Sequence, residues 1–593
     1  MNHAVDQSNT NLVSWPKNTL LTLRKHRAQA GQRIPVLVIA SVPLVIVVIF
    51  LLVIGLVAFQ VRDHLGIMTY GLGNFRQLYT DPFVYTSFIN TAIVSTVSLA
   101  VAFGFGIPIA WLVERTNLPA RGLVFPLFTI NLLVPSFFTA MGWVILFHKR
   151  IGVINKALMA LLPIDQPPLN IVSVSGMGVV EGFALAPLAF IMIAASFRAL
   201  DPTLDECARV HGISFLTRMR KITIPLMTPG IMGAAIFVLA ITVAAFDIPA
   251  TIGLSNRIYT FSTFVYTTAF PPESPPNYGL VAASSSVMLI IGFFLTWRYM
   301  VVIGQSHRYA VVRGKDYRLD LIDLGRWSIL GWSIIGFVLL LNMVLPLLAL
   351  VWASLTPYLQ IPSVSAFQMV SLENFRLVPW SQFMTSLRNS VILFFSVPTI
   401  TTVFGLAISW VVIRSKWRIG QTFDVLAFLP HVIPSLILAV GAFLLAIHWF
   451  PAQFGLFERT VGIIMLVYVV TRISFSTRML NSGLLQIHEE LDEAGYVAGL
   501  GPVEVIRKIL IPLLSATLLY SWLWMALLSF RELTVAAFLA SRGNLTLPVT
   551  IWSIWNNGQL NQAAAAALVF VGLLTPLIIL YFAFGRRRIS MPQ

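Results

Sequence analysis

Long apolar stretches alternate with short polar segments along the whole chain. Runs of about 20 residues or more with few charges are typical of transmembrane helices, because about 20 helical residues cross the hydrocarbon core of a bilayer. Transmembrane strands would instead alternate in polarity over about 10 residues, and this pattern is absent. Twelve runs qualify, near residues 34–60, 87–113, 122–147, 174–196, 229–253, 279–303, 327–354, 387–413, 423–449, 461–480, 513–535 and 563–584.

The composition agrees with a membrane protein. The 593-residue chain is 57% hydrophobic and only 10% charged, whereas soluble domains carry about 25% charged residues. Its single cysteine, Cys207, excludes an internal disulfide framework and a cysteine-based metal cluster. No spacing typical of metal ligands occurs elsewhere. We therefore expect an all-α polytopic membrane protein of about 12 transmembrane helices that holds no metal.

The cations predict an orientation in the bilayer. Most of the 39 lysines and arginines lie in the N-terminal arm, the C-terminal tail and the loops after even-numbered spans. By the positive-inside rule these segments, and hence both termini, are cytoplasmic. The orientation in the membrane then explains much of the net charge of +16, and no nucleic-acid partner has to be assumed. The first apolar run exceeds the roughly 7–15 residues of a signal peptide, so we expect it to be an uncleaved anchor.

The chain contains an internal duplication. Asn74-Phe75-Arg76 recurs 300 residues later as Asn374-Phe375-Arg376, and Leu204-Asp205-Glu206 recurs 287 residues later as Leu491-Asp492-Glu493. Two six-span halves in the same order predict parallel repeats around a pseudo-two-fold axis along the membrane normal. The predicted parts are an N-terminal arm (1–33), a first repeat (34–303), a linker (304–326), a second repeat (327–584) and a basic tail (585–593).

One loop motif occurs in both halves, between the fourth and fifth spans. It reads Glu206-Cys207-Ala208-x3-Gly212-x9-Ile222-x-Ile224-Pro225 and then Glu493-Ala494-Gly495-x3-Gly499-x9-Ile509-x-Ile511-Pro512. Each glycine stands where a residue with positive φ would end a short helix, and each proline can open the next span. The two rigid loops suit docking onto a symmetric partner. The alternative, an amphipathic loop lying on lipid headgroups, explains the identical spacing less well.

The motif resembles the EAA loop, E-A-A-x3-G-x9-I-x-L-P, of binding-protein-dependent ABC importer permeases with the type I fold. Cys207 and Gly495 replace alanines, and isoleucine replaces leucine before each proline. In that family the loop forms the coupling helix that sits in a groove of the ATPase subunit. The resemblance assigns ATPase coupling to Glu206, Ala208, Gly212, Pro225, Glu493, Ala494, Gly499 and Pro512.

The chain lacks a phosphate-binding loop of its own. Its only Gly-Lys pair, Gly314-Lys315, is followed by Asp316 and does not fit G-x4-G-K-[ST]. We therefore expect a transport subunit that is not itself an enzyme and binds no cofactor directly. The resemblance implies two ATP-binding subunits that hold ATP and Mg, a periplasmic solute-binding protein, and a place in the bacterial inner membrane.

Polar residues within the predicted spans are candidates for a transport pathway, because charged groups in a membrane are costly. The ionisable ones are Glu181, Asp247, Arg472, Arg531 and Glu532. Since neighbours on a helix face different ways, we expect Arg531 and Glu532 not to line a pathway equally. Proline with serine in mid-span predicts a kinked, gate-forming pair; packing kinks and snorkelling side chains are the alternatives. The candidates are Pro135, Ser136, Glu181, Asp247, Pro434, Ser435, Arg531 and Glu532.

The cargo rests on resemblance alone. A fused double permease with Phe-Asp-x-Pro in one half and Arg-Glu-Leu in the other resembles ferric-iron importers, although no residue by itself demands iron. Polyamine, thiamine and phosphonate importers have related permeases and remain alternatives. A different class, a secondary transporter driven by an ion gradient, would need a buried coupling carboxylate, for which Glu181 is the candidate.

Overall fold

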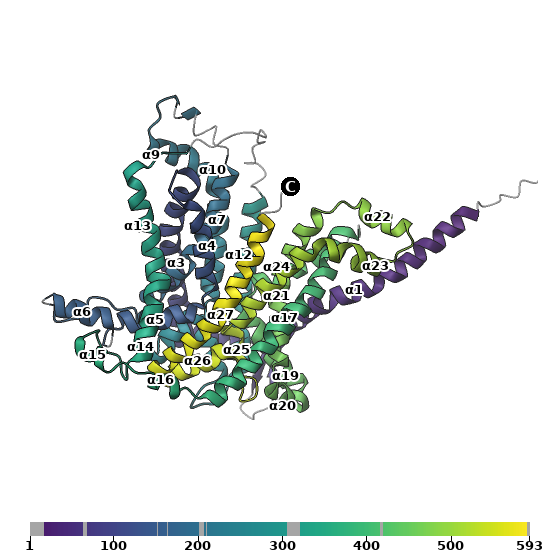
Figure 1. The fold of residues 1–593 in the computed structure, drawn as a ribbon. Coiled ribbons are helices and arrows are strands. Elements are labelled where there is room, and N and C mark those ends of the chain that lie inside the picture. Colours follow the sequence, from purple (N-terminus) through teal and green to yellow (C-terminus); the bar gives the residue numbers. More distant parts are fainter. Residues whose placement is uncertain are drawn as a thin grey trace, which may run out of the picture.

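A computed structural model describes residues 17–62, 68–150, 152–162, 164–200, 207–208, 210–304, 321–415 and 419–589. Within these ranges the chain is almost entirely helical, and its strands form one short antiparallel hairpin, β1 (Gln60–Arg62) with β2 (Met68–Tyr70). Figure 1 shows the long helices as a bundle, with the short helices α9, α22 and α23 toward its top. We call that end the loop end.

The first half of the chain contributes eleven of the described α-helices. They are α1 (Lys17–Ala58), α2 (Gly73–Thr80), α3 (Pro82–Arg115), α4 (Val124–Leu133), α5 (Ser136–Phe147), α6 (Val153–Leu161), α7 (Val174–Ala199), α9 (Phe215–Arg218), α10 (Ile224–Ala244), α11 (Phe261–Ala269) and α12 (Tyr278–Gly304).

The second half follows the same order. Its helices are α13 (Ser328–Leu339), α14 (Leu345–Leu355), α15 (Val364–Gln368), α16 (Glu373–Arg376), α17 (Trp380–Arg414), α18 (Ile419–Val432), α19 (Ser435–Trp449), α20 (Pro451–Arg459), α21 (Gly462–Leu485), α22 (Glu490–Val497), α23 (Pro502–Val505), α24 (Ile511–Phe530), α25 (Thr534–Phe538), α26 (Leu547–Asn556) and α27 (Leu560–Ile589).

Ten of the described helices are long and apolar enough to cross a membrane, and two bent pairs bring the number to twelve. The bent pairs are the predicted third and ninth spans: α4 and α5 meet at 87°, and α18 and α19 meet at 99°. Pro135 and Pro434 are the N-cap residues of α5 and α19. Because proline has no backbone N–H to continue the helix, each span breaks there. The predicted mid-span kinks are therefore sharp corners.

The helices extend beyond the predicted spans at both ends of the chain. α1 begins at Lys17, inside the segment predicted as a polar arm, and α27 continues to Ile589, inside the predicted tail. Most of the predicted linker, residues 305–320, lies outside the described residues. Its end is described: Asn117, in the turn after α3, donates a hydrogen bond from its amide to Asp323 at 2.7 Å.

The predicted repeat is visible as the same hydrogen bonds made twice. Asn74 donates to the carbonyl oxygens of Ala58 and Gln60 at 3.0 and 2.8 Å. Asn374 donates to those of Ser354 and Thr356 at 3.0 and 2.8 Å. These carbonyls lie at or just after the end of the first span of each half, where no backbone N–H of a following helical turn is available to bond them. The repeated asparagine therefore caps equivalent helix ends.

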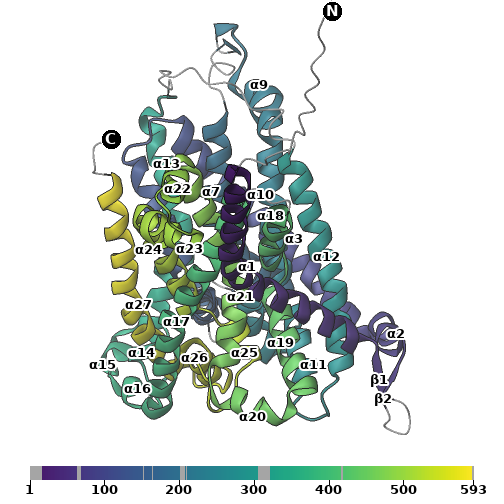
Figure 2. The same cartoon turned by 90° about the vertical axis from the view of Figure 1, so that its right-hand side faces the viewer.

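The first span of each half packs against the other half. α1 contacts α12 of its own half and also α17 and α19 of the second, and it crosses the face seen in Figure 2. α14 contacts α5 of the first half and α27 of its own. This exchange ties the two halves together.

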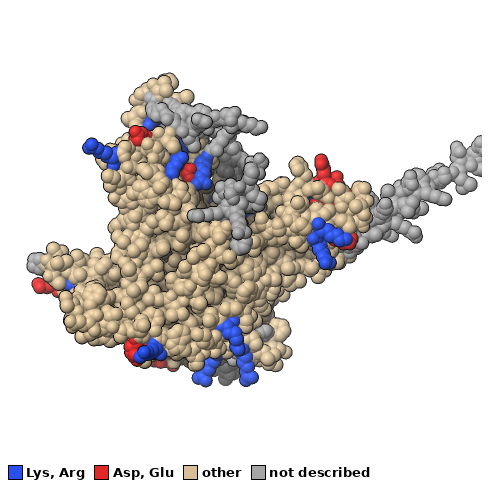
Figure 3. Space-filling view, viewed as in Figure 1, with Lys and Arg blue, Asp and Glu red and all other residues tan. Residues whose placement is uncertain are grey.

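Charged side chains gather toward the ends of the molecule. In the view of Figure 3, the middle of the bundle shows almost no Lys, Arg, Asp or Glu, whereas both ends carry them. Such an apolar belt between polar ends is what a bilayer requires. The fold is thus that of an integral membrane protein with two parallel helical repeats.

Candidate functional site

The loop between α21 and α24 contains the second copy of the repeated motif. α22 ends at Val497, and Gly499 follows with φ of +87°. The N–H of Leu500 donates to the carbonyl of Gly495 at 3.0 Å, and that of Gly499 donates to Tyr496 at 3.1 Å. This pair of bonds is a Schellman motif, which requires a left-handed residue and so favours glycine. Pro502 then opens α23, as its position predicts.

The first copy turns in the same way where it is described. Gly212 has φ of +72°, and the N–H of Ile213 donates to the carbonyl of Ala208 at 3.1 Å. These residues are the counterparts, 287 positions earlier, of Leu500 and Gly495. Pro225 and Pro512 both lie in the first turn of the following spans, α10 and α24. Glu206 lies outside the described residues.

Equivalent apolar side chains project from both loops into solvent. Val210 and Val497, each two residues before the glycine of positive φ, are 84% and 90% exposed. Leu216 and Val503, on the following short helices, are 77% and 49% exposed. The two loops thus expose aliphatic groups at equivalent positions.

Acidic groups shape the second loop from within. The carboxylate of Glu504 accepts hydrogen bonds from Lys508 at 3.0 Å and from the N–H of Gly501 at 3.1 Å. These bonds lower the pKa of Glu504 below its usual value. Asp492 is buried instead, and the loss of solvent raises the pKa of its carboxyl, although Arg414 beside it opposes the rise. The carboxyl groups of Glu504 on α23 and Asp492 on α22 thus differ in environment.

A central cavity of about 360 Å³ lies between the two halves. Both helix breaks line it, through Val134 and Ser136 in the first half and Pro434 and Ser435 in the second. Side chains of α7, α10, α12 and α21 complete its wall. The lining residues of α12, such as Tyr299, lie in the half of that helix nearer the loop end, whereas those of α10 lie between Ile236 and Ala244. The cavity therefore extends from the breaks toward the loop end.

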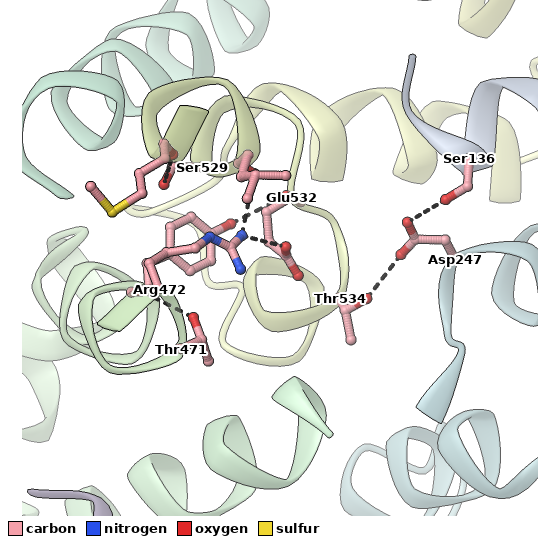
Figure 4. A network of polar contacts seen from close by, with 10 residues as sticks. Ser136, Asp247, Thr471, Arg472, Ser529, Glu532 and Thr534 are labelled. Carbon is pink, nitrogen blue, oxygen red and sulfur yellow. Dashed lines mark hydrogen bonds and ion pairs between the residues drawn. The ribbon is translucent and has the colours of Figure 1, made fainter. Parts of the chain in front are cut away.

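A polar network that joins the two halves also lines the cavity. Asp247 accepts a hydrogen bond from Ser136 at 2.8 Å and another from Thr534 of the second half at 2.9 Å. Figure 4 shows this bridge beside a second group, in which Arg472 pairs with Glu532 at 2.6 Å. Asp247 and Glu532 lie where the helices are interrupted, after α10 and α24, rather than inside continuous spans as predicted.

Glu532 pairs with Arg472 of α21, but Arg531 and Glu532 both contribute to the lining of the cavity. The reason is that α24 ends at Phe530, and the residues beyond it no longer follow helical directions. The guanidinium of Arg531 donates to the backbone carbonyl of Val134 at 3.2 Å. That carbonyl lies at the break between α4 and α5, so a cation from the second half satisfies an acceptor at the corner of the first.

Glu181 differs from the other cavity carboxylates. It lies on α7, is 6% exposed and lines the cavity, but among the described residues it has no hydrogen-bond or ion-pair partner. Tyr468, its counterpart 287 positions later on α21, donates to the carbonyl of Glu532 at 3.2 Å. The cavity thus contains one carboxyl group, that of Glu181, without a hydrogen-bond or ion-pair partner among the described residues.

Seven of the eight predicted pathway residues line this one cavity, and the eighth, Pro135, lies between Val134 and Ser136. The sequence reasoning missed Thr534 and His431. The sequence feature that could have identified Thr534 is its position in the repeat, because it corresponds to Asp247, 287 positions earlier. His431, beside Pro430, stacks on Phe237 of the other half with ring centroids 5.2 Å apart. Nothing local to either residue shows which side chain it meets.

Comparison with known proteins shows similarity to membrane components of transport systems. Residues 385–590 match the family described as "Binding-protein-dependent transport system inner membrane component". Ferric transport system permease protein FbpB of Actinobacillus pleuropneumoniae is 22% identical over 71% of this chain and 60% of its own length, so the chain spans about three fifths of that relative. Fe(3+)-transport system permease protein FbpB 2 of Haemophilus influenzae is 21% identical over 81% of this chain and 86% of its own length.

Proposed function

Starting from the match of residues 385–590 to the binding-protein-dependent transport components and from the ferric transport relatives, we propose that this chain is the membrane subunit of an ATP-driven importer of ferric iron. Two separate ATP-binding subunits, which hold ATP and Mg, dock at the loop end, and a solute-binding protein delivers cargo at the other end. The loop end, with both termini, faces the cytoplasm of a bacterium, and the protein lies in the inner membrane. The first repeat comprises residues 34–303 and the second 327–584.

The twin loops carry the proposal of ATP coupling. Both turn at a left-handed glycine, close with the same hydrogen bond and expose equivalent valines, Val210 and Val497. Two equivalent apolar projections fit two identical grooves, one on each copy of a partner. Binding of ATP closes the partner dimer and brings the loops together, and the helices that follow them, α10 and α24, end at the cavity network.

The cavity supports a cationic cargo. Of its carboxylates, Glu532 is paired with Arg472, and Asp247 accepts two hydroxyl hydrogen bonds. Arg531 is engaged by a backbone carbonyl. Glu181 is the carboxyl without a described partner, and when it is ionised it lowers the energy of a cation in the cavity and raises that of an anion. A single carboxylate binds weakly, which suits a passage that must release what it admits. Among cations we propose ferric iron, because the similar proteins are named as ferric transport permeases.

The proposal is tested by uptake of radiolabelled ferric iron into host cells. Three strains are compared: wild type, a deletion of this gene, and the deletion complemented in trans. Excess unlabelled polyamine, thiamine or phosphonate is added in parallel assays. We expect uptake to be lost in the deletion strain, restored by complementation and unaffected by the competitors. Equal iron uptake in all strains, with no second iron importer present, would refute iron as cargo. Inhibition of iron uptake by a polyamine would instead identify the polyamine as the cargo.

A further inference from the structure

One guanidinium joins three helices at the loop end of the second half. Arg414, the last residue of α17, has a side chain only 6% exposed. It donates to the carbonyls of Leu484 and Ile487, at and just beyond the end of α21, at 3.1 and 2.6 Å. The same group forms ion pairs with Asp492 of α22 at 3.0 Å and with Glu489 at 3.7 Å.

The first half contains the same arrangement as far as it is described. Arg115 ends α3 and donates to the carbonyls of Phe197 and Leu200 at 3.0 and 3.3 Å, at the end of α7. Arg115 precedes Arg414 by 299 positions, and both carbonyl pairs are 287 positions apart. Asp205, the sequence counterpart of Asp492, lies outside the described residues. The arginine is thus a feature of both repeats.

The helices held by these arginines also reach the cavity. α21 carries Arg472, which is twelve residues before Leu484 and therefore about 18 Å away along a rigid helix. Arg472 forms the pair with Glu532 that lines the cavity. α7 carries Glu181 in the first half. A push on α22 that is passed to the end of α21 would accordingly move a group in the pathway.

Resting on the proposed function, we propose that Arg414 and Asp492 form the mechanical link through which the ATPase-docking helix α22 moves α21. Arg115 takes the equivalent part in the first half. The pair suits this role because both side chains are only 6% exposed, so that separating them would leave two buried charges uncompensated. Arg414 is a positioning residue and touches no cargo.

The variant Asp492→Asn separates the link from the fold. It removes the charge on α22 that faces Arg414 but leaves the hydrogen bonds from Arg414 to the carbonyls of Leu484 and Ile487. Asp424→Asn is the matched control, because Asp424 pairs with Arg478 of the same α21 at 3.1 Å without touching the loop. Four variants are assembled in proteoliposomes with the ATPase subunits and the binding protein. They are Asp492→Asn, Asp424→Asn, Arg414→Gln and the double variant Arg414→Gln/Asp492→Asn. ATP hydrolysis and iron uptake are measured together.

We expect Asp492→Asn to retain ATP hydrolysis while iron moved per ATP falls about tenfold or more, and the control to match wild type. The double variant should be no worse than Arg414→Gln, because the two residues act on the same link. Unchanged iron per ATP in Asp492→Asn would overturn the proposal. So would equal losses of hydrolysis and uptake, which would mean weaker docking. The double variant Gly212→Val/Gly499→Val separates two kinds of failure. If Asp492→Asn is unaffected and this double variant also retains iron uptake, the proposed function itself is refuted. If the double variant loses iron uptake, only the proposed link between α22 and α21 is refuted.

Discussion

Asp247 and Thr534 occupy equivalent positions in the two repeats, 287 residues apart, and they hydrogen-bond to each other at 2.9 Å. Equivalent residues of two parallel repeats meet only close to the axis that relates them. The contact therefore marks the pseudo-two-fold axis inside the bundle. Since the cavity extends from this network toward the loop end, the network closes the pathway on the other side.

Weakening this contact should favour opening at the network. In Thr534→Val the hydroxyl that bonds the Asp247 carboxylate is removed, and a bond to a charged group contributes about 1.5–3 kcal/mol. We expect the loops to move closer together on average, as the opposite end opens. Pulsed electron spin resonance between labels at Val210→Cys and Val497→Cys, with Cys207→Ser, measures this distance in lipid nanodiscs.

The control for that measurement is Thr228→Val. The hydroxyl of Thr228 is exposed and bonds only the carbonyl of Ile224 in its own helix, so its distance distribution should equal that of the labelled parent. If Thr534→Val also gave the parental distribution, the contact would have no part in holding the pathway closed.

The loop glycines should tolerate asparagine but not valine. At Gly212 and Gly499 a Cβ would meet nothing within 4 Å, so any effect of substitution comes from the positive φ. Left-handed backbone costs an ordinary L residue roughly 1–2 kcal/mol, and asparagine less. We expect Gly212→Val/Gly499→Val to abolish iron uptake at normal membrane abundance, whereas Gly212→Asn/Gly499→Asn retains it. Equal uptake by both double variants would argue against a need for the rigid turn.

The exposed valines should decide whether the ATPase subunits bind. A carboxylate at Val210 and Val497 would have to be desolvated in an apolar groove, which is costly. We therefore expect Val210→Asp/Val497→Asp to lose the ATPase subunits when the permease is purified by affinity in detergent. Val364→Asp, at a valine 81% exposed on α15, should co-purify with them normally. Co-purification by all variants would place the docking surface elsewhere.

Glu181 should matter for cation passage without affecting the fold. Glu181→Gln keeps the shape of the side chain and removes the ionisable carboxyl group that has no described partner. We expect the maximal rate of ferric iron uptake to fall about tenfold, in line with about 1.5 kcal/mol lost for a charged contact. Initial rates over a range of binding-protein concentrations measure it. Glu373→Gln, an exposed carboxylate on α16, serves as the control, and a wild-type rate in Glu181→Gln would remove Glu181 from the pathway.

Part of this protein could be predicted from sequence because the responsible forces act locally. A span needs about 20 apolar residues wherever it packs, so all twelve appear as hydropathy runs. A turn with positive φ needs glycine, so Gly212 and Gly499 mark the ends of the loop helices. The prolines mark where two spans must break, and the repeated asparagines mark the duplication.

The sequence by itself thus determined the spans, the repeats and the twin loops, and it identified the polar residues that membranes exclude unless they are needed. Only the tertiary structure decided which of these groups meet. Arg531 satisfies the carbonyl of Val134, 397 residues away, and Arg414 joins α17 to α21 and α22. Such contacts depend on the rotation and tilt of packed helices, which no local pattern specifies, because each helix presents several faces of similar polarity to its neighbours.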